Sequence, residues 1–303
     1  MIKNTPTHFN KLISIVIPTY NHGRFLDRAL KSIINQTYTN WEVIIIDNHS
    51  TDNTANIVKS FNNPNITHLK VHNNGIIAKS RNTGISVANG EWIAFLDSDD
   101  WWADDKLEIC SSFLVETVDL VYHDLKIVYD KQKLFRKKSI KSRQLNKPVL
   151  INLLVGGNII ANSSVILRKA LIEKIGGISE NENLIAAEDY YTWLKIAELS
   201  NNFKHVPNAT GFYLIHEQSH SKKDMSIPTR FAISEFLDNI DFKQRNKIEA
   251  YLNYTSGRYN FLLGNYAVAA KKLMFSLMYG KLSIRIKSLI MLVTCTFIKV
   301  VKK

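Results

Sequence analysis

Three carboxylates and a serine, Asp97-Ser98-Asp99-Asp100, directly follow the apolar residues Phe95 and Leu96. Three acids this close together repel one another unless a positive group joins them. A hard divalent cation can take oxygen ligands from one or two carboxylates, while substrate phosphates and water supply the rest. The spacing is therefore compatible with a Mn²⁺ or Mg²⁺ site. The alternative is a solvated turn with a helix N-cap, which is the commoner fate of such a run on its own.

A second pair of acids, Glu188-Asp189, begins a segment whose apolar residues recur with helical spacing up to Leu199. Acidic side chains are favoured at the positive N-terminus of a helix, and this alone would explain the pair. A chemical role for these two acids, beyond stabilising the helix N-terminus, therefore depends on the neighbouring sequence.

The elements that must position these acids follow an alternating pattern. Short β-branched runs at 14–17, 41–46, 66–71 and 91–96 alternate with helical patterns at 24–34, after Asp52, and at 76–88. This order predicts a mostly parallel sheet covered by helices. Ligands of such sheets bind at the carboxyl ends of the strands. The residues expected to contact a ligand are therefore those that follow the strands: Pro18-Thr19-Tyr20-Asn21, Asp47-Asn48 and Asp97-Ser98-Asp99.

Composition and charge restrict the class of protein. The 303 residues carry 39 Lys and Arg against 27 Asp and Glu, a net charge of +12, and 45% are hydrophobic, which is enough for a packed core. The two cysteines, Cys110 and Cys295, offer neither a disulfide framework nor a cysteine zinc site, so we expect a reducing compartment. We expect neither a signal peptide nor a transmembrane helix, and hence a soluble or peripherally bound chain.

Four segments carry a family resemblance: Ser14-Ile-Val-Ile-Pro18-Thr-Tyr-Asn21, Asp47-Asn-His-Ser-Thr-Asp52, Ala78-Lys-Ser-Arg81-Asn82-Thr-Gly84, and the run from Ala88 to Asp100. In this order and at these separations they resemble the family 2 glycosyltransferases. The resemblance implies the GT-A fold, an α/β Rossmann-like mixed sheet flanked by helices, with a C-terminal helical extension. It implies a catalytic domain at 1–227, of which 1–100 would bind the nucleotide sugar and 101–227 the acceptor, followed by a helical region at 228–303.

The resemblance assigns the donor-binding residues by position: Pro18, Thr19, Tyr20, Asn21, Asp47, Asn48, Gly75, Arg81, Asp97 and Ser98. Asn48 stands where the family carries a second acid. An amide oxygen can accept a hydrogen bond from uracil without contributing charge, so uridine and thymidine diphosphate sugars both stay open, with the UDP-sugar preferred. The structural alternatives are a turn role for Asp47 and helix capping by Thr19 or Asn21.

The resemblance also assigns the metal ligands. Asp99 would bind Mn²⁺ or Mg²⁺ directly, and Asp97 would reach the ribose or a metal-bound water. His216 falls where many relatives carry a histidine after the last core strand, and it would face the diphosphate or complete the metal shell. An ordinary loop histidine is the alternative for His216.

On the acceptor side, Ala187-Glu188-Asp189 resembles the family's Glu-Asp motif. The resemblance makes Asp189 the catalytic base, which takes the proton of the attacking hydroxyl in an inverting transfer. Glu188 would bind or orient the acceptor, and Trp101 would wall the sugar pocket, unless that ring is an ordinary core aromatic.

The predicted function is an inverting, metal-dependent hexosyltransferase. It would move glucose or galactose from a UDP-sugar to a polyprenyl-diphosphate-linked glycan of a surface polysaccharide, such as O-antigen or capsule. We expect it in the cytoplasm, peripheral at the inner face of the plasma membrane. Three alternatives are a non-catalytic sugar-binding module, a glycoside hydrolase, and a nucleic-acid-binding protein, although no nucleic-acid-binding motif is present.

The region 281–303 sets apolar residues between Lys and Arg and is too short an apolar run to span a bilayer. An interfacial helix on an anionic membrane surface is the preferred interpretation. A terminal helix buried against the rest of the protein is the alternative.

Overall fold

A computed structural model of the chain describes residues 10–130, 138–217, 223–238 and 240–301. The chain divides into two compact units. The first unit comprises Met1–Val149, Ile159–Glu180 and Lys195–Glu217, and the second comprises Leu150–Asn158, Asn181–Leu194 and Gln218–Lys303. Segments of the two units alternate along the chain. The domain boundary expected at residue 227 stays a prediction.

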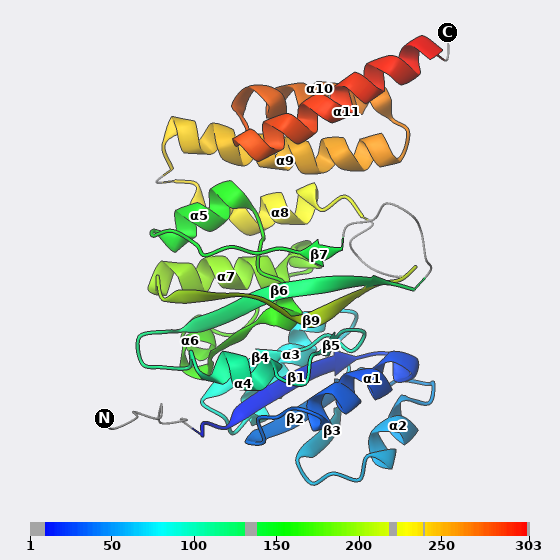
Figure 1. Cartoon of the computed structure of the whole chain (residues 1–303), viewed down its shortest axis with the longest axis vertical. Helices are drawn as coiled ribbons and strands as arrows, with labels where there is room; N and C mark the ends of the chain where they lie inside the picture. Colours follow the sequence, from blue (N-terminus) through cyan, green and yellow to red (C-terminus); the bar gives the residue numbers. More distant parts are fainter. Residues whose placement is uncertain (1–9, 131–137, 218–222, 239, 302–303) are drawn as a thin grey trace, which may run out of the picture. The chain divides into compact units, whose positions relative to one another are not determined.

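One mixed sheet forms the centre of the first unit (Figure 1). Its strands are β1 (Ile13–Thr19), β2 (Trp41–Asp47), β3 (Ile66–Lys70), β4 (Trp92–Phe95), β5 (Trp101–Trp102), β6 (Leu120–Tyr129), β7 (Ser139–Ile140), β8 (Ile166–Arg168) and β9 (Phe203–Ile215). Their order in space is β3-β2-β1-β4-β8-β6-β9-β5, and β7 pairs with β6.

The parallel half of the sheet confirms the four strands predicted from the sequence. Strand β1 pairs in parallel with β2 and with β4, and β2 pairs in parallel with β3. The register sets Thr19 opposite Asp47. The segment after β4 emerges at the same edge, so three of the predicted ligand-binding segments meet at the carboxyl ends of neighbouring strands.

Helices cover both faces of this half. The first unit contains α1 (Gly23–Ile34), α2 (Thr54–Ser60), α3 (Ile77–Val87), α4 (Lys106–Ser111) and α6 (Lys169–Lys174). Alternate residues of β1, among them Ile15, pack with Leu30 of α1 and Leu107 of α4 in one buried cluster. On the opposite face α3 approaches so closely that a Cβ at Gly84 would lie 2.5 Å from a methyl group of Val16. Glycine is therefore required there for helix–sheet packing.

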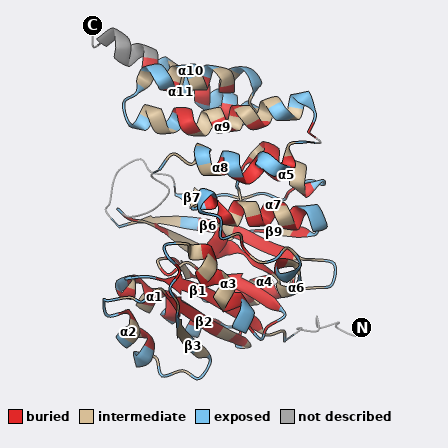
Figure 2. Ribbon diagram, turned by 180° about the vertical axis from the view of Figure 1, so that it is seen from behind, coloured by how far each residue is buried: buried red, intermediate tan, exposed pale blue. Residues whose placement is uncertain are grey.

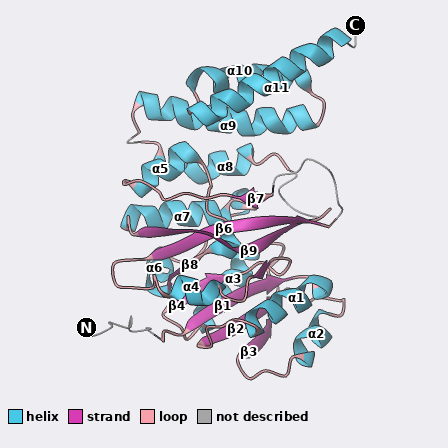
Figure 3. Ribbon diagram, viewed as in Figure 1, coloured by secondary structure: helices cyan, strands magenta, loops and turns pink. Residues whose placement is uncertain are grey.

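The second half of the sheet is not evident from the sequence. The long strands β6 and β9 run parallel to each other, whereas β8 is antiparallel to β4 and β6 (Figure 3). The register of β6 shifts beside Asp124, and β9 contains Pro207 and Gly211, residues more typical of turns. In the segment 129–147, which is rich in Lys and Arg, residues 131–137 lie outside the described residues and Ser139–Ile140 form the short strand β7.

The second unit is helical beyond its short earlier segments, as predicted. It contains α8 (Ser226–Ile233), α9 (Phe242–Leu262), α10 (Tyr266–Tyr279) and α11 (Leu282–Val301), while α5 (Val149–Gly156) and α7 (Glu188–Leu199) contribute residues to both units. Ala269, Leu273 and Cys295 form one buried cluster in this unit. Figure 2 colours the buried positions along the helices red. None of the helices in the described ranges is both long and apolar enough to cross a membrane.

Candidate active site

Two side chains from other parts of the chain hold the carboxylate of Asp97, which lies in the loop after β4. Its Oδ1 accepts hydrogen bonds from Nη2 of Arg81 at 2.8 Å and from Nδ2 of Asn162 at 3.0 Å. Arg81 is buried, whereas the Asp97 side chain stays 29% exposed. These two contacts fix the direction of a carboxylate that stays accessible to a ligand.

Asp99 is held by a histidine from a distant part of the sequence. Its Oδ2 lies 2.9 Å from Nε2 of His216, and its carbonyl accepts a hydrogen bond from Nη2 of Arg28 at 3.1 Å. The Asp99 side chain is 22% exposed. The structure thus brings together Asp99 and His216, two of the three residues predicted as metal ligands, and the third, Asp97, lies two positions before Asp99 in the same loop. Whether they bind metal stays a prediction.

The chemistry of these side chains fits a hard divalent cation. Two carboxylates and an imidazole nitrogen are suitable donors for Mn²⁺, and Asp97 and Asp99 both reach the surface. Within the described residues, no group of three His, Cys, Asp or Glu side chains converges on one point to form a closed metal cage. A Mn²⁺ or Mg²⁺ held here would therefore take part of its shell from substrate phosphates and water, as Mg²⁺ usually does.

Asp100 has a structural environment instead. It is buried, its Oδ2 accepts a hydrogen bond from Oγ of Ser163 at 2.6 Å, and its Oδ1 accepts one from the backbone N–H of Leu214 at 3.0 Å. Burial, then the charges of Asp99 and Asp97, raise the pKa of Asp100 well above its usual value. Ser163 Oγ also accepts the N–H of Asp97 at 3.1 Å, so one serine fixes both ends of the acid loop.

Two histidines lie next to each other at this loop. His22 Nδ1 lies 2.8 Å from Oγ of Ser98, and its ring is edge-to-face with that of His216 at a centroid distance of 6.0 Å. Burial lowers the pKa of His22, which Asp99 partly offsets. His22 therefore stays mostly neutral at neutral pH and can either donate or accept a hydrogen bond.

Trp101 follows the acids but has both faces of its ring covered. The Arg28 guanidinium lies 3.5 Å from the ring centroid, and Phe212 stacks on Trp101 at 5.0 Å with an angle of 7° between the planes. Only the edge of Trp101 is left for a sugar. Its acceptor role stays a prediction, while its packing role is evident.

Asp47 and Asn48, which are predicted to bind the nucleoside, already contact other groups of the protein. The Asp47 carboxylate is fully buried, accepts the N–H of Ser50 at 2.8 Å, and lies 3.3 Å from Nε2 of His68. Asn48 Oδ1 accepts the N–H of Asn73 at 3.0 Å. Since these oxygens already have protein partners, base recognition by Asp47 and Asn48 would require sharing or exchanging those bonds. It stays a prediction.

The first-strand loop is shaped by Asn21, which has a positive φ of 51°. Its Oδ1 accepts the N–H of Thr51 at 2.8 Å, and its own N–H donates to Oγ of Ser50 at 2.8 Å. Pro18 and Thr19 are buried, and Tyr20 is 55% exposed. Asn21 therefore joins the loops after β1 and β2, and donor binding by this segment stays a prediction.

Gly75 occupies a turn in which the backbone itself requires glycine. Its φ is +81°, a Cβ there would meet nothing within 4 Å, and its N–H donates to Oδ1 of Asn73 at 2.9 Å. The left-handed conformation explains this glycine without a bound ligand.

The acids that open α7 belong to the second unit. Glu188 is buried, whereas Asp189 is half-buried and its Oδ2 accepts a hydrogen bond from Nδ2 of Asn158 at 3.2 Å. Ala186, just before them, has a φ of +70°, which is unusual for a residue with a Cβ. The strained turn sets the direction in which the helix and its acids begin.

Comparisons with known proteins identify the family. The family model described as "Glycosyl transferase family 2" matches residues 14–176, more than half of the chain. The chain belongs to glycosyltransferase family 2. A similar relative is the Escherichia coli protein WfgD, named a UDP-Glc:alpha-D-GlcNAc-diphosphoundecaprenol beta-1,3-glucosyltransferase, which is 30% identical over 191 residues, 63% of this chain and 71% of WfgD.

Solved structures show that this family 2 glycosyltransferase has the GT-A fold. S. aureus TarS 1-349 in complex with UDP-GlcNAc aligns with a TM-score of 0.62 at 22% identity, covering 90% of this chain and 82% of TarS. The mannosyltransferase PcManGT from Pyrobaculum calidifontis, in complex with GDP-Man and Mn²⁺, aligns with a TM-score of 0.59 at 21% identity, covering 91% and 77%.

Sequence reasoning missed several residues around the acids of this family 2 enzyme. His22 contacts Ser98, and Arg28 contacts the backbone of Asp99. Asn162 contacts Asp97, and Ser163 contacts Asp100. His22 is the N-cap of α1 and Arg28 lies within this helix. Because α1 follows a strand end that was expected to bind a ligand, the sequence could have indicated both residues. Asn162 and Ser163 carry no such signal, because the pairing of β8 with β4 brings them to the loop.

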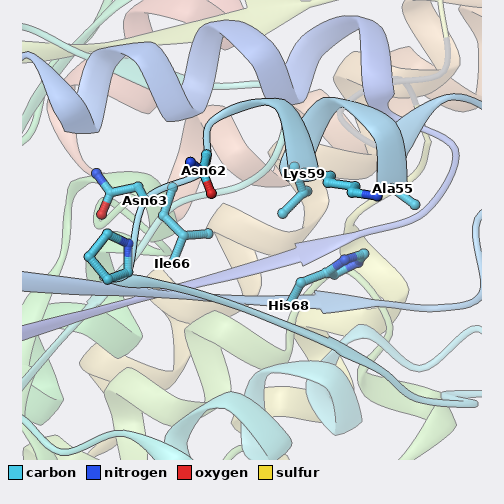
Figure 4. A pocket seen from close by; sticks show the side chains of 8 residues that line it. Ala55, Lys59, Asn62, Asn63, Ile66 and His68 are labelled. Atoms are coloured by element: carbon cyan, nitrogen blue, oxygen red, sulfur yellow. The ribbon is translucent and has the colours of Figure 1, made fainter.

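A cleft of about 450 Å³ between α2 and β3 lies apart from the acid loop. Figure 4 shows Lys59 and His68 at this cleft, which is lined by Ala55, Val58, Lys59, Asn62, Asn63, Pro64, Ile66 and His68. Its lining contains no carboxylate. Through His68 the cleft borders Asp47, but none of its residues is among the predicted site residues.

Proposed function

We propose that this family 2 enzyme is an inverting hexosyltransferase that moves a sugar, glucose first and galactose second, from UDP to a hydroxyl of a lipid-linked glycan. The observation that supports this most directly is the pair of partly exposed acids at the strand ends, Asp97 held by Arg81 and Asp99 held by His216. The UDP-Glc donor and the GlcNAc-diphosphoundecaprenol acceptor in the name of WfgD favour a donor and a lipid-linked acceptor of these kinds.

The first unit would bind the donor. Arg81 is buried and positively charged beside Asp97, so it would orient that carboxylate and add positive potential where the diphosphate lies. Asp97, Asp99 and His216 would hold Mn²⁺ or Mg²⁺, which when bound offsets the negative charge of the departing diphosphate. Ser98 Oγ and His22 would offer neutral hydrogen-bonding groups at the same loop.

Asp189 would act as the general base. As the acceptor oxygen attacks the anomeric carbon, the bond from that carbon to the diphosphate oxygen breaks, UDP departs, and the hydroxyl proton passes to the Asp189 carboxylate. Attack from the face opposite the leaving group inverts the anomeric configuration. The hydrogen bond from Asn158 would orient Asp189 without neutralising its charge. Glu188 would contribute to acceptor binding.

We place this activity at the inner face of the plasma membrane, because a lipid-linked acceptor is confined to a bilayer. Glycan assembly in a surface polysaccharide, O-antigen or capsule, is the corresponding process.

Nucleotide release from a panel of UDP-, dTDP- and GDP-sugars tests the proposal. The assay uses a lipid-linked GlcNAc diphosphate acceptor, with and without Mn²⁺. We expect Mn²⁺-dependent release of UDP from one donor by the wild-type enzyme and loss of this release in Asp99→Ala. The exposed, nearby Asp104→Asn serves as the matched control and should retain activity. UDP-sugar binding without product for every acceptor would favour a non-catalytic binding module, and metal-independent transfer would contradict the proposed use of the acids.

A further inference from the structure

Helix α11 has an exposed stripe of large aliphatic side chains. The stripe consists of Leu282, Ile286, Leu289, Ile290 and Val293, each between 51% and 73% exposed. Their spacing of three and four residues places them on one face of the helix. A continuous apolar face of this kind at a protein surface is characteristic of a binding surface.

The opposite face of α11 already serves for packing. Ile284, Ser288 and Cys295 are buried, and Cys295 packs with Ala269 and Leu273 of α10 in the centre of the second unit (Figure 2). The helix therefore does not need its outer stripe to fold against its neighbours. The exposed aliphatic residues are left for a partner.

The charge of this region indicates the chemistry of that partner. After Glu249 the sequence contains no acidic residue and nine basic ones: Arg258, Lys271, Lys272, Lys281, Arg285, Lys287, Lys299, Lys302 and Lys303. These nine account for most of the net charge of +12. On α11 itself, Arg285 and Lys287 are both exposed and lie about 100° to either side of Ile286 around the helix axis, so they border the stripe.

We propose that the stripe, with Arg285 and Lys287 at its borders, docks the chain onto an anionic lipid bilayer. The aliphatic side chains would enter the boundary between headgroups and acyl chains, while the cations stay at the level of the phosphates. A second copy of the chain is disfavoured as the occupant, because it would bring the same uncompensated basic region against this one. This stripe would be the surface that holds the enzyme at the membrane location given under the proposed function, and the proposal rests on that function.

The inference is tested by sedimentation of the full chain with vesicles. We expect binding to mixed phosphatidylglycerol and phosphatidylcholine vesicles, weakening as salt is added, and little binding to phosphatidylcholine alone. The double variant Ile286→Glu with Ile290→Glu should bind the mixed vesicles at least about tenfold more weakly. As a matched control, Ile34→Glu with Val87→Glu removes two exposed aliphatic side chains from the first unit and should bind like the wild type.

The basic borders are tested separately with Arg285→Gln and Lys287→Gln, each of which should weaken binding about fivefold at low salt. Binding of UDP-sugar should be unchanged in all these variants, because none alters a proposed donor-site residue. Thermal unfolding reports whether each variant is folded.

Three results would overturn the inference. They are absence of vesicle binding by the wild type, equal binding to neutral and anionic vesicles, and full binding by the folded Ile286→Glu, Ile290→Glu variant. A dimer that this variant converts to monomers, without vesicle binding, would assign the stripe to a second copy instead. Vesicle binding by a chain that transfers no sugar would contradict the proposed function and leave the docking surface intact.

Discussion

The acids after β4 and the acids that open α7 carry the same carboxylates in different surroundings. Asp97 and Asp99 each have a basic partner, Arg81 and His216, at 2.8 and 2.9 Å. Asp189 instead has a neutral amide partner, Asn158, at 3.2 Å, in the second unit. Asp97 is held by a guanidinium and Asp99 by an imidazole, and the Asp189 side chain accepts a hydrogen bond from an amide.

The two sites also differ in their place in the fold. Asp97 and Asp99 lie after a strand of the parallel half of the sheet, at the edge where ligands of such sheets bind. Asp189 lies in the first turn of a helix that begins in the second unit. We propose a ligand role at the strand ends and a base role at the start of α7, and each activity prediction below tests one side of this contrast.

Asp189→Asn should have the largest effect on activity. The amide keeps the size of the side chain but cannot take the hydroxyl proton, so we expect the turnover rate to fall by about 10²- to 10⁴-fold. Binding of UDP-sugar, measured by calorimetry, should be unchanged. The exposed, upstream Glu182→Gln is the control, and wild-type turnover by Asp189→Asn would show that another group is the base.

His216→Ala should raise the Mn²⁺ concentration needed for half-maximal activity by about 10- to 100-fold, because the proposed metal site loses one ligand and the Asp99 carboxylate loses the imidazole that contacts it. Much of the turnover rate should return at high Mn²⁺. A metal titration of activity measures this, with the exposed His72→Ala as control. An unchanged metal requirement would reduce the His216–Asp99 pair to a packing contact.

Arg81→Lys should lower the transfer rate divided by the Michaelis constant for UDP-sugar by about tenfold. Lysine keeps the charge but cannot reproduce the planar guanidinium that contacts Asp97 from a buried position. Steady-state kinetics with varied UDP-sugar measures the change. If Arg81→Lys behaves like the wild type, charge alone is sufficient at this position.

Lys106→Met should affect stability while leaving activity nearly unchanged. The Lys106 ammonium is buried 3.6 Å from the ring centroid of Trp102, behind the acid loop, and burial lowers its pKa to about 8. Since the folded pKa lies below the unfolded one, the wild-type protein is most stable above the unfolded pKa and loses stability as the pH falls through about 8.

The Lys106→Met variant cannot bind this proton. We therefore expect a gain in the free energy of unfolding on the order of 2 kcal/mol at neutral pH, which shrinks as the pH rises above about 8. Urea unfolding at several pH values measures it. A variant that is less stable at neutral pH would show that the ammonium–Trp102 contact outweighs the cost of burial.

The parallel half of the sheet could be predicted because its strands are short, β-branched and bounded by clear helical patterns. The segments at 14–17, 41–46, 66–71 and 91–96 all form strands within a few residues of the expected bounds. The strands β6 and β9 could not be predicted in the same way. His123, Asp124 and Pro207 interrupt their patterns, and pairing with distant strands, not local propensity, makes these segments extended.

The sequence by itself determined the family, the strand-end acids and the helical character of the chain beyond residue 227. These three features depend on residue type and on spacing between residues that are close together in the sequence, so they can be recognised without the structure. Only the tertiary structure decided that His216 meets Asp99, that Asn162 and Arg81 meet Asp97, and that Trp101 is covered on both faces. His216 and Asp99 are 117 positions apart, and a contact over such a separation is fixed by strand order and register.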